Sequence, residues 1–118
     1  MYARIIKLNE KEVLHEAEEI IADELDELNR QSRYCFTPSE IAREFGMSGS
    51  DLNSFLRDRK ILYRQNGCHH LTSKYRGQGL TAYRYTLNYG SGGRRRMHTK
   101  LVWTQRGREF LHELIVKS

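Results

Sequence analysis

One short stretch of the chain carries polar side chains of the kinds that hydrogen bond to the edges of DNA bases. They recur three and four residues apart, which places them on one side of a helix: Ser50, Asn53, Ser54 and Arg57. Hydroxyl, amide and guanidinium groups can reach base edges in a major groove. The pattern indicates a base-reading helix or, as the alternative, an ordinary helix with a solvated face. Asp51 and Asp58 lie at the edge of the same side and would be repelled by phosphates.

The opposite side of this stretch is apolar and predicts how the helix is held. Its members are Leu52, Phe55 and Leu56. Upstream, Thr37 and Glu40 have the spacing of a capping box, which predicts the start of an earlier helix. Gly46 is suited to end that helix, and Ser48 is suited to cap the next one. We therefore expect two capped helices joined by a glycine turn, which is the layout of a helix-turn-helix.

Two β-hairpins and a final helix are predicted after this pair. The expected strand pairs are residues 60–64 with 69–73, and residues 83–89 with 97–103. Asn66-Gly67 is a strong signal for the turn of the first hairpin. Thr104 is suited to cap the last helix. The predicted fold class is α+β, a winged helix-turn-helix with an extended β-hairpin wing, preceded by an amphipathic helix.

Basic residues around these elements are expected to hold the DNA backbone. The expected phosphate contacts are Arg43, Lys60 and Arg64. Three further arginines follow the glycine-rich connection at residues 90–93, and we expect them at the tip of the wing, in a minor groove or on phosphate: Arg94, Arg95 and Arg96.

The net charge of +5 is unevenly distributed. Residues 1–31 contain nine acidic and four basic residues, whereas residues 32–118 contain sixteen basic and six acidic residues. Such an asymmetry indicates a body that faces nucleic acid and an acidic attachment.

The acidic attachment is predicted to be a short strand followed by an amphipathic helix that ends near Arg30. A heptad seam runs along this helix and is interrupted by Glu24; its members are Leu14, Ala17, Ile21 and Leu28. Three arrangements stay open: a helix packed on its own domain, a helix that pairs with a preceding strand, and a helix that forms a homodimer. We divide the chain into residues 1–33, the strand and acidic helix, and residues 34–118, the winged domain.

The large apolar residues predict one core. We expect burial of Phe45, Leu52, Phe55, Leu56, Trp103 and Phe110. The strand tyrosines have two interpretations, a half-buried core layer or a platform on which bases stack.

Other chemistry finds little support in the sequence. Cys68-His69-His70 with Cys35 lacks the paired spacing of a structural zinc site, so we expect no metal and two free thiols. No phosphate loop or nucleophile motif is visible, so we expect neither an enzyme nor a cofactor. No apolar run approaches the roughly 20 residues of a membrane span, and no signal peptide is visible. The sequence therefore predicts a cytoplasmic protein that does not associate with a membrane.

Three motifs in this order resemble the C-terminal KilAC domain of phage antirepressor proteins. They are Thr37–Ala42 with Met47-Ser48, the tyrosine loop Tyr75–Leu80, and the segment Trp103–Leu111. The similarity spans roughly residues 34 to 116. It implies a DNA-binding fold and a regulatory role in a phage or prophage.

Together these observations predict a phage- or prophage-derived transcriptional regulator of the antirepressor type that reads duplex DNA with its helix-turn-helix. It would act in the cytoplasm of a bacterium or phage-infected host. The alternative is a protein-interaction antirepressor that binds and occludes a phage repressor without contacting DNA. Binding to duplexes that weakens steeply with salt would favour the first hypothesis.

Overall fold

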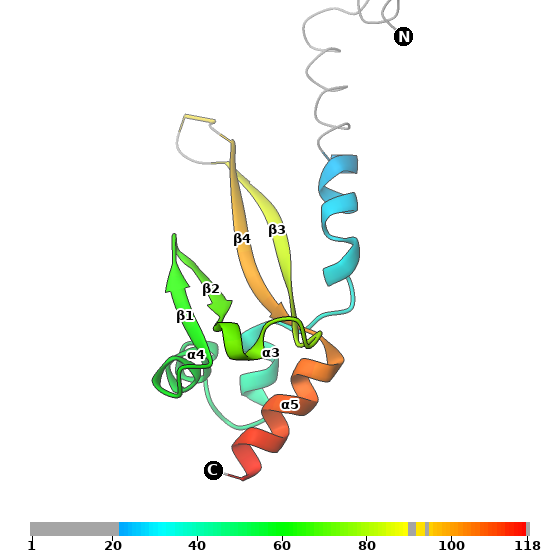
Figure 1. Ribbon diagram of the computed structural model, residues 1–118. Coiled ribbons are helices and arrows are strands. Elements are labelled where there is room, and N and C mark those ends of the chain that lie inside the picture. The colour runs from blue at the N-terminus through cyan, green and yellow to red at the C-terminus, as the bar shows by residue number, and fades with distance from the viewer. Residues whose placement is uncertain (1–21, 90–91, 94, 118) are drawn as a thin grey trace, which may run out of the picture.

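The computed structural model describes residues 22–89, 92–93 and 95–117, and it has the α+β composition predicted from the sequence (Figure 1). A helical segment at residues 22–28 leads into the 3-10 turn η1 (Arg30–Ser32). The elements that follow are α3 (Pro38–Arg43), α4 (Gly49–Asp58), β1 (Leu62–Gln65), β2 (Cys68–Leu71), η2 (Ser73–Tyr75), β3 (Thr81–Tyr89), β4 (Arg95–Trp103) and α5 (Gln105–Val116). The expected strand at the N-terminus, the seam residues Leu14, Ala17 and Ile21, and Arg94 lie outside the described residues.

The capped helix pair is confirmed. Thr37 Oγ1 accepts a hydrogen bond from the Glu40 backbone N–H at 3.2 Å, and Glu40 Oε1 accepts one from the Thr37 N–H at 3.2 Å. Gly46 has a φ of +69°, a conformation that costs glycine little, and it turns the chain between the helices. Ser48 Oγ accepts from the Asp51 N–H at 3.0 Å and begins α4.

The two hairpins form separate antiparallel sheets. In the first, Asn66 and Gly67 have φ angles of 53° and 73°, as the Asn-Gly turn predicts. In the second, the pairing runs from Thr81 opposite Trp103 to Tyr89 opposite Arg95.

This register corrects the expected start of the second strand of the wing. Arg95 and Arg96 lie at the outer end of the hairpin, as expected, but they are paired in β4 opposite Tyr89 and Asn88, so the strand starts two residues before the expected residue 97. The reason is local, because Gly92 and Gly93 both have positive φ angles and can turn the chain before the arginines begin.

The core is built around Trp103, which is wholly buried, and it includes Leu52 and Leu56 as expected. Three phenylalanines that we expected in the core are instead half-buried at its margin: Phe45, Phe55 and Phe110. Two of these rings have a polar neighbour there. The Arg59 guanidinium lies 4.4 Å from the centre of the Phe55 ring, and the His112 ring lies 4.6 Å from that of Phe45. The limited interior is filled by Ile41, Ile61, Leu101, Val102 and Leu111.

Two of the strand and loop tyrosines pack against this core, in line with the core interpretation. They are Tyr75 and Tyr83. The Tyr83 hydroxyl also lies 2.7 Å from His70 Nδ1, which ties the second hairpin to the first.

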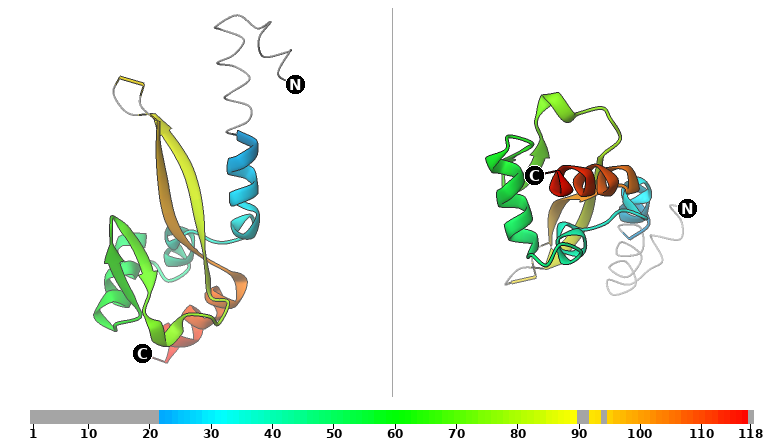
Figure 2. Two further views of the ribbon diagram at one scale, coloured as in Figure 1. Left: turned by 45° about the horizontal axis from the view of Figure 1, so that its top comes forward. Right: turned by 90° about the horizontal axis from the view of Figure 1, so that it is seen from below.

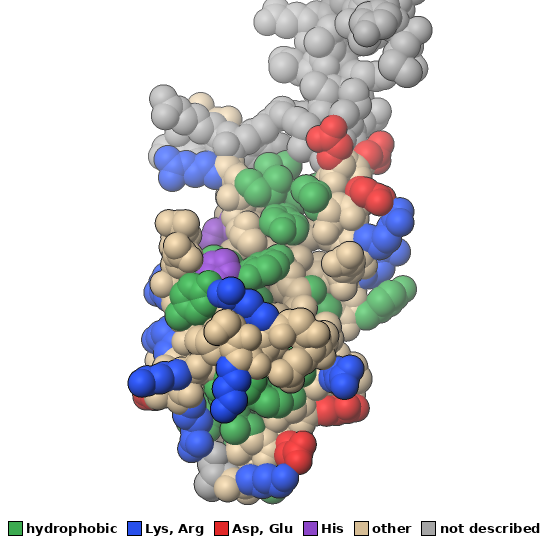
Figure 3. Space-filling model, viewed as in Figure 1, with side chains coloured by type: hydrophobic (Ala, Val, Ile, Leu, Met, Phe, Trp, Pro, Cys, Tyr) green, Lys and Arg blue, Asp and Glu red, His purple; other side chains and the backbone are tan. Residues whose placement is uncertain are grey.

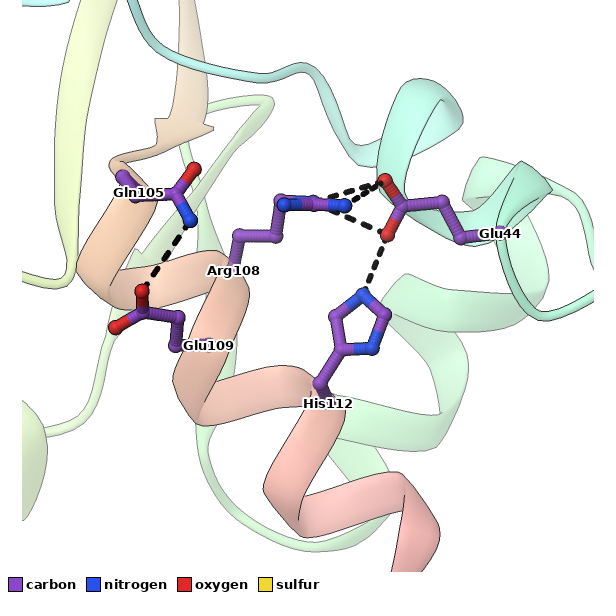
Figure 4. Close-up of polar contacts among 5 residues, drawn as sticks. All are labelled: Glu44, Gln105, Arg108, Glu109 and His112. Carbon is purple, nitrogen blue, oxygen red and sulfur yellow. Dashed lines mark hydrogen bonds and ion pairs between the residues drawn. The ribbon is translucent and has the colours of Figure 1, made fainter.

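The helix α5 is fixed against the turn that follows α3 (Figure 4). Arg108 Nε donates to both carboxylate oxygens of Glu44, at 2.8 and 3.1 Å, and His112 Nε2 contacts the same group. The hydrogen bond with His112 and the charge and hydrogen bond of Arg108 hold the pKa of Glu44 below its usual value. In the same first turn of α5, a Cβ on Gly107 would lie 1.9 Å from the Leu80 carbonyl oxygen, so only glycine allows this close approach.

The chain before α3 is attached along β3, and Figure 2 shows the helical segment 22–28 beside that strand. The Asn29 side-chain amide donates to the Tyr85 carbonyl at 2.8 Å and accepts from the Tyr85 N–H at 2.7 Å. Arg84 Nη2 donates to the carbonyl oxygens of Ser32 and Cys35, at 2.8 and 3.1 Å. The two Asn29 bonds satisfy part of the outer edge of β3, which the two-stranded sheet leaves unpaired.

The difference in burial between Leu52 and Phe55 gives a stability prediction. We expect Leu52→Ala to lower the free energy of unfolding by about 2–5 kcal/mol, because it removes a wholly buried side chain. Phe55→Ala should cost less than the roughly 3–5 kcal/mol of a fully buried phenylalanine. Urea denaturation of the two variants checks the order, and a larger loss for Phe55→Ala would contradict the packing described above.

The contact between Glu44 and α5 predicts a dependence of stability on pH. Because the folded-state pKa of Glu44 is lowered, its contribution is present above the pKa of an unfolded glutamate and is lost as the pH falls through the folded-state value. We expect Glu44→Gln to be less stable than the wild type at pH 7 and to approach it at low pH, in thermal melts. The control is Glu109→Gln, because the Glu109 carboxylate accepts a bond from the neutral amide of Gln105 (Figure 4). Parallel curves for wild type and Glu44→Gln would contradict the prediction.

Candidate nucleic-acid interface

The polar side of α4 lies away from Leu52 and Leu56, as the helical pattern predicts. Ser50 is exposed, whereas Asn53, Ser54 and Arg57 are half-buried. They are half-buried because the hairpins fold back towards this side of the helix. The face is therefore part of a hollow and not a free helical ridge.

An open hollow of about 280 Å³ joins α4 to both hairpins. Its polar lining comes from Ser39 of α3, Ser50, Asn53 and Arg57 of α4, Arg64 of β1, His69 of β2 and Lys100 of β4. A second hollow of about 190 Å³ adjoins it and shares Asn53, His69 and Lys100. Three cationic side chains from three elements thus face one space, which is an arrangement that favours a negatively charged ligand.

From the sequence, Arg57 is expected to project from the outward side of α4. In the structure its guanidinium is instead hydrogen bonded to two other side chains. Its Nη1 lies 2.6 Å from His69 Nε2, and its Nη2 donates to Ser54 Oγ at 3.1 Å. Because arginine can only donate, His69 Nε2 is the acceptor and the ring proton is on Nδ1. The guanidinium is thus held at two nitrogens between α4 and β2.

The surroundings disfavour a positive charge on His69. Burial lowers the pKa of His69 below its usual value, and the nearby charges of Arg57, Arg64 and His70 lower that pKa further. A neutral ring is what the contact with Arg57 requires.

The other predicted cations lie in different places. Arg64 is exposed in the hollow, opposite His69 in the register of the first hairpin. Arg43 is exposed at the end of α3, and Lys60 is exposed just after α4 with a φ of 61°. Arg96 is exposed on β4, whereas Arg94 and the side chain of Arg95 lie outside the described part of the chain.

Two basic residues of the hollow, Lys100 and His69, were not identified as site residues from the sequence. Lys100 could have been found, because Arg96, His98 and Lys100 alternate along one strand and so share a face. His69 had no such signal, since its contact with Arg57 depends on how β2 packs against α4.

Acidic side chains lie both on α4 and on the helical segment before η1. Asp51 and Asp58 are exposed on α4, and four further carboxylates lie on the helical segment, those of Asp23, Glu24, Asp26 and Glu27. Figure 3 shows Asp and Glu side chains gathered on that segment near the top of the view, with Lys and Arg side chains spread over the hairpins below.

The cysteines and histidines form no metal cluster within the described ranges. Cys35 and Cys68 are free, and burial raises the pKa of both thiols above the usual value. Across the same part of the chain, each helix is too short or too polar to span a bilayer.

Comparison with known protein families gives one match. The model of a family described as phage antirepressor protein KilAC domain matches residues 11–118. The match includes the motifs from Thr37 to Leu111 and starts well before residue 34, so it also covers most of the residues predicted to form the acidic helix. No match was found among curated proteins or among solved structures.

Proposed function

Because this chain belongs to the phage antirepressor KilAC domain family, we propose that it is a phage or prophage regulator that binds duplex DNA through a winged helix-turn-helix. In this proposal α3 and α4 are the helix-turn-helix, and the hairpin of β3 and β4 is the wing. The protein would act in the cytoplasm of the bacterial host, where phage operators are found.

The convergence of cations on the polar side of α4 is the observation that carries this proposal. Arg57, Arg64 and Lys100 come from α4, β1 and β4 and line the same hollow as Ser50 and Asn53. A duplex presents phosphates on both sides of a groove and base edges at its floor. Cations on the hairpins beside a helix with small polar groups suit that arrangement.

The residues divide into two proposed roles. Ser50, Asn53, Ser54 and Arg57 would face base edges in the major groove. Phosphates would be bound by cations around the helix, namely Arg43, Lys60, Arg64 and Lys100, with Arg94, Arg95 and Arg96 towards the end of the wing.

A second function is favoured by the exposed carboxylates. Asp51 and Asp58 on α4, with the acidic segment at residues 22–28, could meet a basic surface of a phage repressor. In that case the protein would occlude the repressor and would not need DNA. Phosphates are repelled by the same carboxylates, so the two functions predict opposite responses to their removal.

We also propose that the acidic helix forms a homodimer. Leu28 is 52% exposed and lies on the heptad seam, so its side chain is free to pack against a second copy. Palindromic operators are commonly read by dimers.

The duplex-binding proposal predicts different effects for base-reading and phosphate-binding residues. In selections from a random duplex pool, Arg57→Ala should relax the preference at one base position, by about 1–3 kcal/mol, and change the salt dependence little. Arg64→Ala and Lys100→Ala should weaken binding to all duplexes alike. Each should reduce the slope of log K against log salt by about 0.9 for every phosphate that is no longer neutralised.

The matched control is Lys117→Ala, which removes one exposed positive charge at the end of α5, outside the hollow. Its salt slope should stay at the wild-type value. The same behaviour in all four variants would contradict the proposed roles. The alternative function would be established if the wild type bound no duplex at low salt and bound a repressor with an affinity that does not change with salt.

The dimer proposal predicts a change in mass. Replacing Ile21 and Leu28 together with lysine should give a folded monomer, because charges in the seam cannot be buried against a second copy. Sedimentation equilibrium compares the variant with the wild type, and circular dichroism checks that it is folded. A wild type that is already monomeric at high concentration would end this proposal.

A further inference from the structure

We propose that His69 is a positioning residue that, with Ser54, holds Arg57 in the orientation that reads a base pair. The inference rests on the proposed function, and it assigns His69 a part in sequence specificity that does not require His69 to touch DNA. The feature that points to it is the pair of hydrogen bonds that fixes one guanidinium between α4 and β2.

The geometry of the two bonds restricts the Arg57 side chain at both terminal nitrogens. Nη1 is 2.6 Å from His69 Nε2, and Nη2 is 3.1 Å from Ser54 Oγ. Ser54 lies one turn earlier on the same helix, whereas His69 belongs to a different element and is itself held in a strand. The guanidinium plane is therefore set by the packing of β2 against α4.

Both bonds leave the guanidinium able to bind a ligand. An arginine has five N–H donors, and two are used here, so three remain. A guanine presents two acceptors, N7 and O6, in its major-groove edge. Arg57 can thus keep its bonds to the protein while it donates to a base.

The charge state of His69 suits a permanent acceptor. Three cationic groups line the hollow with the ring, Arg57 of α4, Arg64 of β1 and Lys100 of β4. A positive charge on His69 would be repelled by the cations among these neighbours, so the ring stays neutral and continues to accept from Arg57.

Fixing the arginine before binding improves discrimination between bases. A long side chain that is free in solution loses rotamer freedom when it binds, and a side chain that is already fixed loses less. A fixed guanidinium also presents its donors in one direction, so a base with acceptors elsewhere is bound less well. Removal of His69 should therefore weaken the preferred duplex more than the other duplexes.

The test compares base preference in the wild type, His69→Leu and His69→Gln, using duplexes enriched from a random pool. The position to follow is the one at which Arg57→Ala loses its preference. We expect His69→Leu to reduce that preference by about 2- to 10-fold, because the arginine must then be ordered on binding. His69→Gln supplies an amide oxygen as acceptor and should retain most of the preference. Binding to duplexes altered at that position should stay within about twofold of wild type.

The control is His98→Leu. His98 lines the adjoining hollow from β4, and the guanidinium of Arg57 bonds instead to His69 and Ser54, so loss of His98 should leave the base preference unchanged. Thermal melts show that each variant is folded. Should His69→Leu fail to fold, His69→Ala removes the same acceptor for Arg57 Nη1 with a smaller side chain and should reduce the same preference.

A double-mutant cycle separates positioning from a general structural role. If His69 acts through Arg57, His69→Leu has no further effect on base preference in the Arg57→Ala background. Equal weakening of all duplexes by His69→Leu, or an undiminished preference at that position, would overturn this inference alone. A wild type that enriches no duplex would instead overturn the proposed function, and this inference with it.

Discussion

The burial of Trp103 is the constraint on which the rest of the structure depends. Its backbone N–H and carbonyl bond to Phe36 at 2.8 and 2.7 Å, and it pairs with Thr81 across the second hairpin. Its ring lies so close to α5 that a Cβ on Gly107 would come within 2.9 Å of it. One wholly buried residue thus joins the chain before α3, the strand β3 and the last helix. Burial of a large aromatic surface stabilises all three attachments together.

The hollow exists only because both hairpins return to the side of α4. The first hairpin is short and brings Arg64 and His69 beside the helix, while the second is long and adds Lys100 from further along the chain. The bond between His70 and Tyr83 and the burial of Leu71 and Leu101 hold the two hairpins at this position. Displacement of either hairpin would separate the cations, so the charge of the hollow depends on the same packing as the core.

The separation of charge follows from the same architecture. The acidic segment is attached along β3, through Asn29 and the guanidinium of Arg84, whereas the hollow opens between α4 and β4. Arg84 and Lys100 are cross-strand partners, yet the first is used to bind backbone carbonyls and the second faces the hollow. Two neighbouring cations on one hairpin therefore have different tasks, one structural and one available for a ligand.

The sequence by itself determined the helix starts at Thr37, Ser48 and Thr104, the turns at Gly46 and at Asn66-Gly67, and the family. The helix starts and the turns depend on hydrogen bonds and backbone angles within about four residues, so their sequence signals are local. Tertiary structure decided that Phe55 is only half-buried, that Arg57 binds His69, and that Lys100 completes the hollow. Each of these depends on which surfaces pack together. Residues 57 and 69 lie on different elements, and the residue pattern within either element does not predict the contact between them.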